Sequence, residues 1–347
     1  MYKKNIAVLA SILLILSLSL VFAGCNSANN AQGGTPQTAN AIIDAEGREI
    51  TFPENINKIA ITCQGGTTHE VVIFGGADMI VAQPSMQKFP HLLKMYPQFN
   101  DVINAGSFDD VNIEQLLQQG PDIVLVGISS KKGNALIEDA GLPTYTMLIG
   151  WAAVDTLKQE FLNIGAMLHN ESQAKALVKH WDETLADLNK VLEKIPENER
   201  KKVYYTGKVI TKANNGDWGR SWIVGSGGIC AVPDNLSGDI SVEQVMEWNP
   251  DVIITQGGNG TADLLGDNRI QDINAIKNKQ VYECPIGGFW WDRPSPEATM
   301  GFLWLAKTLY PEYTQDIDLK QETKDFYKEF YKYELSDEEY EAFFFSK

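Results

Sequence analysis

The loop Ile286–Pro296 carries the side chains best suited to holding a ligand. Its sequence, IGGFWWDRPSP, places Arg293 just after two tryptophans and Asp292. A guanidinium can bind an anion through charge-assisted hydrogen bonds, and the faces of Trp290 and Trp291 can pack on an apolar rim. Two adjacent tryptophans ahead of a helix cannot both face the same core, so we expect one of them to be exposed or to line a cleft. A structural salt bridge from Arg293 to Asp292 and core packing of either tryptophan are the alternatives.

Three further aromatic residues complete the predicted ligand site. Trp218 lies in another glycine-rich loop and is expected to form a second wall beside Arg293. Tyr145 and Trp151 lie near the end of a predicted strand and are expected to supply the opposite wall. Strands and helices alternate along the chain, which predicts a parallel sheet whose ligands collect outside the carboxyl ends of the strands. The loops at those ends include 63–67, 83–90, 105–110 and 128–132.

Other kinds of site find less support in the sequence. A bare Zn²⁺ or Mn²⁺ site needs convergent histidine and carboxylate ligands, but the chain has 4 histidines and none follows His180. The sequence contains no G-x-S-x-G, Walker A or H-E-x-x-H motif, so we expect no catalytic residue, no resident metal and no cofactor. The net charge of −16 argues against nucleic acid as a partner, because phosphate binding needs a basic surface.

A long amphipathic helix is predicted in the middle of the chain. Apolar residues recur at spacings of three and four between Glu171 and Ile195, which places them on one stripe of a helix. Asn170 is a suitable N-cap, and Pro196 forbids continuation. The helix would therefore span about the width of a domain.

The segments on the two sides of this helix repeat each other. Residues 112–126 and 241–255 each read as a helix, a turn and a buried strand. Four positions are identical at a constant offset: Glu114/Glu243, Gln115/Gln244, Pro121/Pro250 and Asp122/Asp251. The repeat predicts an α/β fold with two similar lobes joined by one long helix. We place the first lobe at 41–169, the linking helix at 170–196 and the second lobe at 197–347.

The N-terminus reads as a secretory signal that ends at a cysteine. Lys3 and Lys4 precede an apolar run, and the small residues Ala23 and Gly24 stand directly before Cys25. We therefore predict a signal peptide at 1–24. The following residues to 40 are small and polar and are expected to form a flexible tether.

The remaining cysteines are Cys63, Cys230 and Cys284. Cys230 and Cys284 fall in the same predicted lobe and could form a disulfide. Free thiols are the alternative that we favour, because unpaired cysteines are commonly buried as small apolar residues.

Several motifs together resemble one protein family, the substrate-binding proteins of ABC importers for metal chelates. These are NPDVII at 249–254, GPDIVLV at 120–126, the lipobox-like VFAGC at 21–25 and FWWDRPSPE at 289–297. The tail FYKEFYKYELSDEE at 326–339 is similar to the iron-chelate branch of that family. The resemblance covers essentially the whole chain after the signal.

The resemblance implies a class III substrate-binding fold, in which two Rossmann-like lobes are joined by a single long α-helix and clamp a ligand between them. It implies lipidation of Cys25, attachment to the outer face of the cytoplasmic membrane, a monomeric receptor, and delivery of the ligand to an ABC permease driven by its ATPase. The expected ligand is an iron–siderophore or similar metal chelate. A corrinoid, haem and chelated nickel or cobalt are alternatives, and a surface adhesin is the alternative from another class.

Members of this family usually present a glutamate from each lobe to arginines of the permease. Counting back from Gly75, the first-lobe position falls on His69, with Glu70 beside it. The second-lobe position falls on Val224. We therefore take His69 and Glu70 as the candidate docking residues.

Overall fold

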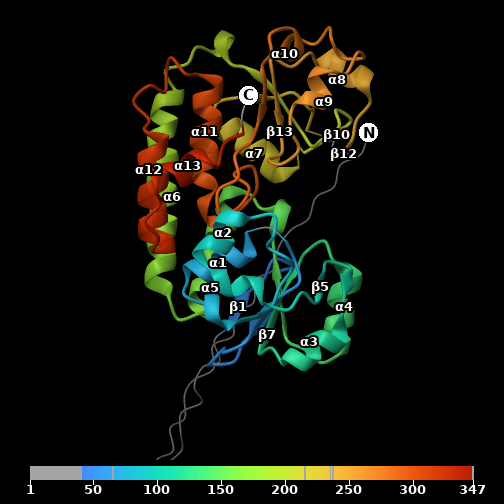
Figure 1. Cartoon of the computed structure of the whole chain (residues 1–347), viewed down its shortest axis with the longest axis vertical. Coiled ribbons are helices and arrows are strands. Elements are labelled where there is room, and N and C mark those ends of the chain that lie inside the picture. Colours follow the sequence, from blue (N-terminus) through green and yellow to red (C-terminus); the bar gives the residue numbers. More distant parts are fainter. Residues whose placement is uncertain (1–40, 65, 215, 235, 237, 346–347) are drawn as a thin grey trace, which may run out of the picture. The chain divides into compact units, whose positions relative to one another are not determined.

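The structure is a computed structural model that describes residues 41–64, 66–214, 216–234, 236 and 238–345. The predicted signal peptide, Cys25 and the tether lie outside this range. Ala39–Lys347 form one compact unit, which contains two α/β lobes (Figure 1). Among the described residues, none of the helices has both the length and the apolar character that crossing a bilayer requires.

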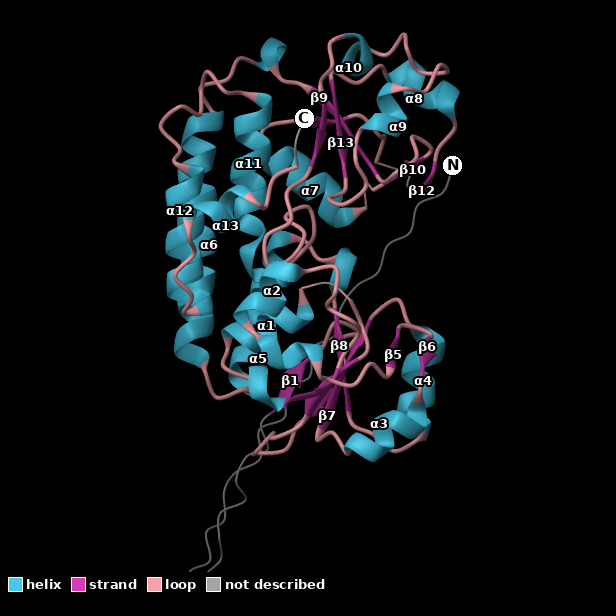
Figure 2. Ribbon diagram, in the orientation of Figure 1, coloured by secondary structure: helices cyan, strands magenta, loops and turns pink. Residues whose placement is uncertain are grey.

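The first lobe is built on a four-stranded parallel sheet (Figure 2). Its strands, in spatial order, are β4 (Ile80–Ala82), β3 (Ile59–Ile61), β7 (Ile123–Gly127) and β8 (Thr144–Met147). The buried strands are apolar on both faces, as expected for a parallel sheet covered by helices on each side. A short hairpin, β1 (Ala41–Ile43) with β2 (Glu49–Thr51), precedes them.

Alternate side chains of these strands enter two different cores. Ala60, Val124 and Val126 pack with Leu116 and Ile137, which belong to α3 (Ile113–Gln119) and α4 (Lys131–Asp139). Side chains of the opposite parity, including those of Ile59, Ile61 and Leu125, join the main core. That core also receives α1 (Thr67–Ile73) and α5 (Val154–Met167). The period-two alternation of a strand thus separates the two helical layers.

The second lobe has a six-stranded mixed sheet. β9 (Lys202–Thr206), β13 (Val252–Thr255) and β14 (Val281–Glu283) are parallel neighbours. β10 (Lys212–Ala213) and β12 (Gly238–Asp239) extend the sheet antiparallel, and β11 (Ile229–Cys230) pairs with β9. The helices are α7 (Asp217–Gly225), α8 (Val242–Trp248), α9 (Ala262–Leu265), α10 (Asn274–Lys277) and α11 (Thr299–Leu309).

The long helix is confirmed as α6 (Glu171–Leu192), whose 22 residues correspond to about 33 Å. Its buried stripe includes Ala174, Trp181 and Leu188. Trp181 donates a hydrogen bond from Nε1 to the carbonyl of Pro296 (2.9 Å), which ties the helix to the loop at 286–296. The predicted N-cap is wrong in one respect, because the Asn170 side chain donates to the carbonyl of Phe74 and does not cap α6.

The internal repeat is confirmed by the way its two helices begin and end. Asn112 caps α3 by accepting a hydrogen bond from the amide of Gln115, and Ser241 caps α8 by accepting one from the amide of Gln244. Both helices end in a left-handed residue, Gly120 in one copy and Asn249 in the other. Each copy then continues directly into a central strand.

Residues 102–104 contribute an isolated bridge, between Ala82 and Ile103, and do not form a longer strand. Cys63, Cys230 and Cys284 are free thiols, so Cys230 and Cys284 do not pair.

Candidate functional site

A cavity of about 390 Å³ lies at the carboxyl ends of the first sheet and is closed on one side by Phe289 of the second lobe. Loops after β3 and β4 and the turn at 104–110 form its walls. Its lining combines apolar side chains, among them Met86 and Phe89, with the polar side chains of Gln64, Thr68, Ser85, Gln87, Asn104 and Ser107 and the charged side chains of Lys88 and Asp110. The position agrees with the rule that ligands of parallel sheets bind outside the carboxyl ends of the strands.

The two lobes approach each other closely beside this cavity. A Cβ atom added to Gly66 would lie only 2.6 Å from the carbonyl oxygen of Pro294 and from Cα of Ser295. No larger residue fits at position 66 without displacing backbone. The loop after β3 is therefore in direct contact with the loop at 286–296.

Aromatic rings from both lobes meet at the edge of the cavity. The ring of Phe89 lies 5.0 Å from that of Phe289 and 4.7 Å from that of Trp290, which meets it edge-on. Trp290 is half-buried, and its Nε1 donates a hydrogen bond to the carbonyl of Gly257 (3.1 Å). The predicted wall residue Trp290 thus lies at the boundary between the lobes.

Arg293 lies in the same loop and is partly buried. Its guanidinium lies 6.0 Å from the ring centre of Tyr205, and the part of the chain that the structure describes offers it no hydrogen-bond or ion-pair partner. The alternative salt bridge with Asp292 does not form, because Asp292 accepts a hydrogen bond from the hydroxyl of Tyr205 instead (2.8 Å). Burial lowers the pKa of Arg293, but the nearby charges of Tyr205 and Asp292 raise it more, so the guanidinium stays protonated.

Trp291 and Trp218 are packing residues, which corrects their prediction as cleft walls. They are 0% and 2% exposed and belong to the main core. Trp218 donates a hydrogen bond from Nε1 to the carbonyl of Asp292 (3.0 Å), so it supports the loop at 286–296 from the side of the core. Of the two adjacent tryptophans, Trp291 faces the core and Trp290 the lobe boundary, as their adjacency predicted.

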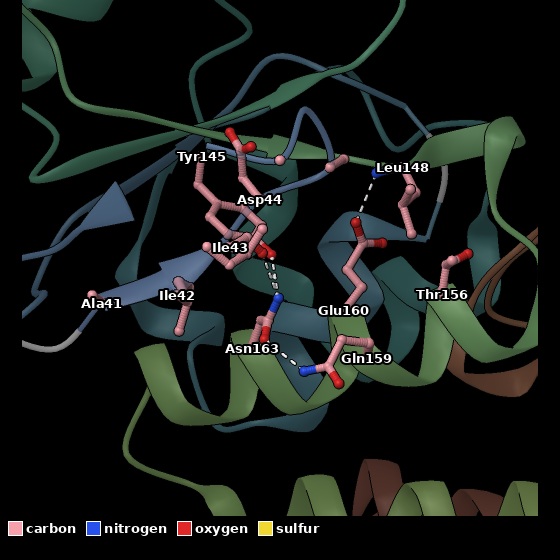
Figure 3. A pocket seen from close by; sticks show the side chains of 12 residues that line it. Ala41, Ile42, Ile43, Asp44, Tyr145, Leu148, Thr156, Gln159, Glu160 and Asn163 are labelled. Atoms are coloured by element: carbon pink, nitrogen blue, oxygen red, sulfur yellow. Dashed lines mark hydrogen bonds between the residues drawn. The ribbon is translucent and has the colours of Figure 1, made fainter. Parts of the chain in front are cut away.

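Tyr145 and Trp151, predicted from the sequence to form one wall of the site, lie in different parts of the protein. Tyr145 is 1% exposed and accepts a hydrogen bond at its hydroxyl from Asn163 of α5 (3.0 Å). It lines a different cavity, between the β1–β2 hairpin and α5, so its prediction as an interlobe wall is wrong (Figure 3). Trp151 is 62% exposed and belongs to a short 3₁₀ turn, Ile149–Trp151, that lies next to α7 of the second lobe.

The cavity around Tyr145 has a volume of about 640 Å³. One of the residues that line it is Glu160, which belongs to a buried pair of carboxyl groups. Glu160 accepts a hydrogen bond from the amide of Leu148 (2.7 Å), which Figure 3 shows as a dashed line. Its carboxyl group also lies against that of Glu70 of α1. Burial raises the pKa of Glu160 to about 7 and the pKa of Glu70 well above its ordinary range, and the pair therefore retains a proton near neutral pH.

His69 and Glu70 cannot face a partner protein in this structure, so their prediction as docking residues is wrong. They are 0% and 2% exposed. His69 Nδ1 is hydrogen-bonded to the hydroxyl of Tyr331 (2.7 Å), and burial lowers the pKa of His69 to about 3, which leaves the ring neutral. The first turn of α1 is packed inside the protein.

Sequence reasoning missed Phe89, Phe289 and Gln83 as residues of the site. Gln83 is 2% exposed, and its Oε1 accepts a hydrogen bond from Thr68, which lines the cavity. Within the described chain, Nε2 of Gln83 has no partner. The loop at 83–90 was identified from the strand order, but nothing local distinguishes these side chains from ordinary packing residues.

A sequence model described as "Periplasmic binding protein" matches residues 61–286, which is more than half of the chain. The chain belongs to the periplasmic binding protein family. The predicted family is therefore confirmed, and so is the two-lobed α/β fold of class III periplasmic binding proteins. Periplasmic binding proteins of this kind bind ligands without catalysis, which agrees with the expectation that the chain is not an enzyme.

Relatives of this periplasmic binding protein are named for several different ligands. The molybdate-binding protein MolA of Haemophilus influenzae is 27% identical over 84% of this chain and 90% of its own. The uncharacterised substrate-binding lipoprotein YvrC of Bacillus subtilis is 24% identical over 89% and 98% of the two chains. The iron(3+)-hydroxamate-binding protein FhuD of Bacillus subtilis is 23% identical over 87% and 97%. The structure of MolA bound to molybdate superimposes with a TM-score of 0.75 at 26% identity, covering 86% of this chain and 99% of that one.

These likenesses establish the coarse function. The protein is an extracytoplasmic substrate-binding protein, and membership of this family implies an ABC permease as its partner.

Proposed function

We propose that this periplasmic binding protein captures a compact, anionic, metal-containing solute between its lobes and passes it to the permease. The observation that carries the proposal is the guanidinium of Arg293, which remains charged and has no acceptor among the described residues. A partly buried guanidinium has five N–H donors in a fixed plane. An oxyanion or carboxylate satisfies these donors with two parallel hydrogen bonds.

The size and lining of the interlobe cavity support a small cargo. A volume of about 390 Å³ is near the lower end of the roughly 300–1,000 Å³ typical of small-molecule sites. Uncharged polar side chains such as Gln64 and Asn104 can add hydrogen bonds to an anion, and the same lining carries one positive and one negative side chain, Lys88 and Asp110. A metal oxyanion or a small anionic chelate, including chelated nickel or cobalt, fits this space better than haem or a corrinoid. The relationship to the molybdate-binding protein MolA supports the same class.

An iron–siderophore, the ligand predicted from the sequence, is the second candidate. The aromatic contact of Phe89, Phe289 and Trp290 favours a ligand with an apolar organic rim. The likeness to the iron(3+)-hydroxamate-binding protein FhuD supports this alternative. A bulky siderophore requires the lobes to separate further than they do here.

Among the residues expected from the sequence, Arg293, Trp290 and Trp151 remain proposed ligand contacts. Arg293 supplies the main charge, and Trp290 supplies an aromatic wall at the lobe boundary. Trp151 is the largest apolar side chain left exposed near the second lobe, and it is proposed as the opposite wall.

The site of action follows from the N-terminal motif. We take Cys25 as the lipid anchor that holds the receptor on the outer face of the cytoplasmic membrane, beside the permease and its ATPase. The likeness to the lipoprotein YvrC supports this assignment. The receptor is proposed to act as a monomer.

Native mass spectrometry with a panel of solutes tests the proposed ligand class. The panel comprises molybdate, tungstate, a nickel chelate, a ferric hydroxamate siderophore, haem and cobalamin, with sulfate as the non-metal control. Retention of molybdate, tungstate or a small anionic chelate, with sulfate released, is the expected result, and tryptophan fluorescence then ranks the affinities. Retention of haem or cobalamin alone would overturn the assignment.

A further inference from the structure

The C-terminal segment Leu319–Phe345 contacts both lobes. It consists of α12 (Leu319–Phe326), a π-helical turn (Tyr327–Tyr331) and α13 (Asp337–Glu341), and Figure 1 shows its helices in red near α6 and α11. The segment follows the second lobe in the sequence, yet several of its contacts are with the first.

Three of these contacts are with α2 (Pro90–Met95) and the residue that ends it. Lys94 forms an ion pair with Glu339 (2.5 Å), and the hydroxyl of Tyr96 donates to the carbonyl of Tyr331 (3.2 Å). The rings of His91 and Phe343 meet edge-on at 4.6 Å. The lobes are thus connected through space by this segment as well as through the chain by α6.

The same segment holds the loop that we propose to contact the ligand, Ile286–Pro296, here called the cargo loop. The hydroxyl of Tyr327 accepts a hydrogen bond from the amide of Gly288 (2.5 Å) and donates one to Oε2 of Glu297 (2.7 Å). The other carboxylate oxygen of Glu297 accepts from the amide of Phe289. Tyr327 and Glu297, both fully buried, therefore bind two consecutive amides of the cargo loop.

The π-helical turn connects this network to the first lobe. Tyr327 and Tyr331 pack with ring centres 5.0 Å apart, and the hydroxyl of Tyr331 is hydrogen-bonded to His69 of α1. Gly288 lies directly over His69, since an added Cβ would come within 3.2 Å of its Cε1. The cargo loop is consequently enclosed by groups from α1, the C-terminal segment and its own following helix.

We propose that Tyr327 and Glu297 are positioning residues that fix the cargo loop in its binding conformation, so that the C-terminal segment controls ligand affinity without touching the ligand. The proposal rests on the proposed function for the part that concerns affinity. A rigid loop loses less conformational entropy on binding than a mobile one, and affinity therefore depends on how firmly the loop is held. The tethered amides belong to Gly288 and Phe289, and Trp290 and Arg293 follow them in the loop. A displacement of the loop therefore moves the side chains of Phe289, Trp290 and Arg293 together.

The test compares Tyr327→Phe with the control Tyr340→Phe, each of which removes one hydroxyl from the C-terminal segment. The ring of Tyr340 packs on Phe343 and Phe344, and within the described part of the chain no hydrogen bond joins its hydroxyl to the cargo loop. Hydrogen–deuterium exchange of the empty protein should show exchange at 286–296 rising about tenfold in Tyr327→Phe, the factor for one typical hydrogen bond, and unchanged in the control. Molybdate affinity, measured by calorimetry on the folded protein, should fall by a similar factor only in Tyr327→Phe.

Unchanged exchange of the cargo loop in Tyr327→Phe would overturn the proposal, and faster exchange with unchanged affinity would overturn its functional half. Glu297→Gln is the second variant, because it replaces one acceptor oxygen by a donor at nearly constant size. Glu297→Gln should give the same increase in hydrogen exchange at 286–296. If Tyr327→Phe does not fold, this variant alone tests the proposal. If wild-type protein binds no anionic metal species, the proposed function fails, while the exchange result still decides whether these residues hold the loop.

Discussion

The carboxyl groups of Glu70 and Glu160 lie against each other inside the first lobe, where the two residues are 2% and 4% exposed. The pair joins α1, which carries Thr68 to the cavity, to α5. Glu160 also holds the amide of Leu148, next to Ile149, which has a positive φ of 53°. A β-branched residue in that region is strained and needs support from its surroundings. The carboxyl pair provides that support for the turn leading to Trp151.

The first prediction concerns pH. The folded pKa values of both carboxyl groups are raised, so the folded protein binds protons more tightly than the unfolded chain. Stability is then greatest below the unfolded pKa of about 4.5 and decreases as pH rises through about 7, with a further loss at higher pH as Glu70 ionises. The melting temperature should therefore fall between pH 7 and pH 8.5. Below pH 7 the buried rings of His69 and His180, whose pKa values burial lowers to about 3 and about 4, contribute the opposite slope, because they bind a proton only in the unfolded chain.

Glu160→Gln isolates this contribution, because an amide imitates the protonated acid. The variant should show a flatter dependence of melting temperature on pH than the wild type. The pH dependence that remains in the variant comes in part from Glu297. Burial also raises the pKa of Glu297 to about 7. Parallel curves for the wild type and Glu160→Gln would show that the pair does not titrate as described.

The second prediction concerns Arg293. Arg293→Ala should weaken binding of the anionic ligand by about 1.5–3 kcal/mol, the typical range for a hydrogen bond to a charged group. The melting temperature of the empty protein should stay nearly constant, because the described residues give the guanidinium no ion-pair partner. Arg269→Ala is the matched control, since it removes the same charge from an exposed ion pair with Asp267. A large loss of stability with intact affinity would identify Arg293 as structural.

The third prediction separates the tryptophans. Trp291→Ala and Trp218→Ala should each destabilise the protein by about 3–5 kcal/mol, because they leave cavities in the core. Trp151→Ala should leave the free energy of unfolding within about 0.5 kcal/mol and should weaken ligand binding. Chemical denaturation measures the first quantity and calorimetric titration the second. Unchanged affinity in Trp151→Ala would remove that residue from the proposed site.

The fourth prediction concerns motion of the lobes. α6 is continuous, and the ion pair of Lys94 with Glu339 adds a second tie between the lobes. A rigid helix resists the bending that extended crossover strands allow, so closure on binding should be of small amplitude. X-ray scattering profiles of the empty and ligand-bound protein should nearly overlap. A large decrease in radius of gyration on binding would contradict this expectation.

The fifth prediction concerns the anchor. Cys25→Ser should release the protein from the membrane fraction and leave its melting temperature unchanged, because the substitution removes the proposed lipid attachment and alters none of the packed residues of the two lobes. Fractionation of cells that express the wild type and the variant measures the release. Equal membrane association of both proteins would rule out lipidation at this residue.

The family, the paired α/β units and the long helix could all be predicted from the sequence. These depend on patterns that are local in the chain, such as the apolar stripe of α6 and the caps Asn112 and Ser241. A helix stripe or a cap requires only neighbouring residues, so it can be read before any tertiary contact is known.

Which of the candidate side chains face a cavity could not be predicted from the sequence, because it depends on how distant elements pack. Trp290 and Trp291 are adjacent and chemically equivalent, yet one reaches Phe89 and the other enters the core. Glu70 looked like an exposed docking charge until the fold placed Glu160 against it. Burial and pairing of this kind depend on residues far apart in the sequence. The free energy of burying a side chain is set by the packing of whole elements around it and not by the preferences of neighbouring residues.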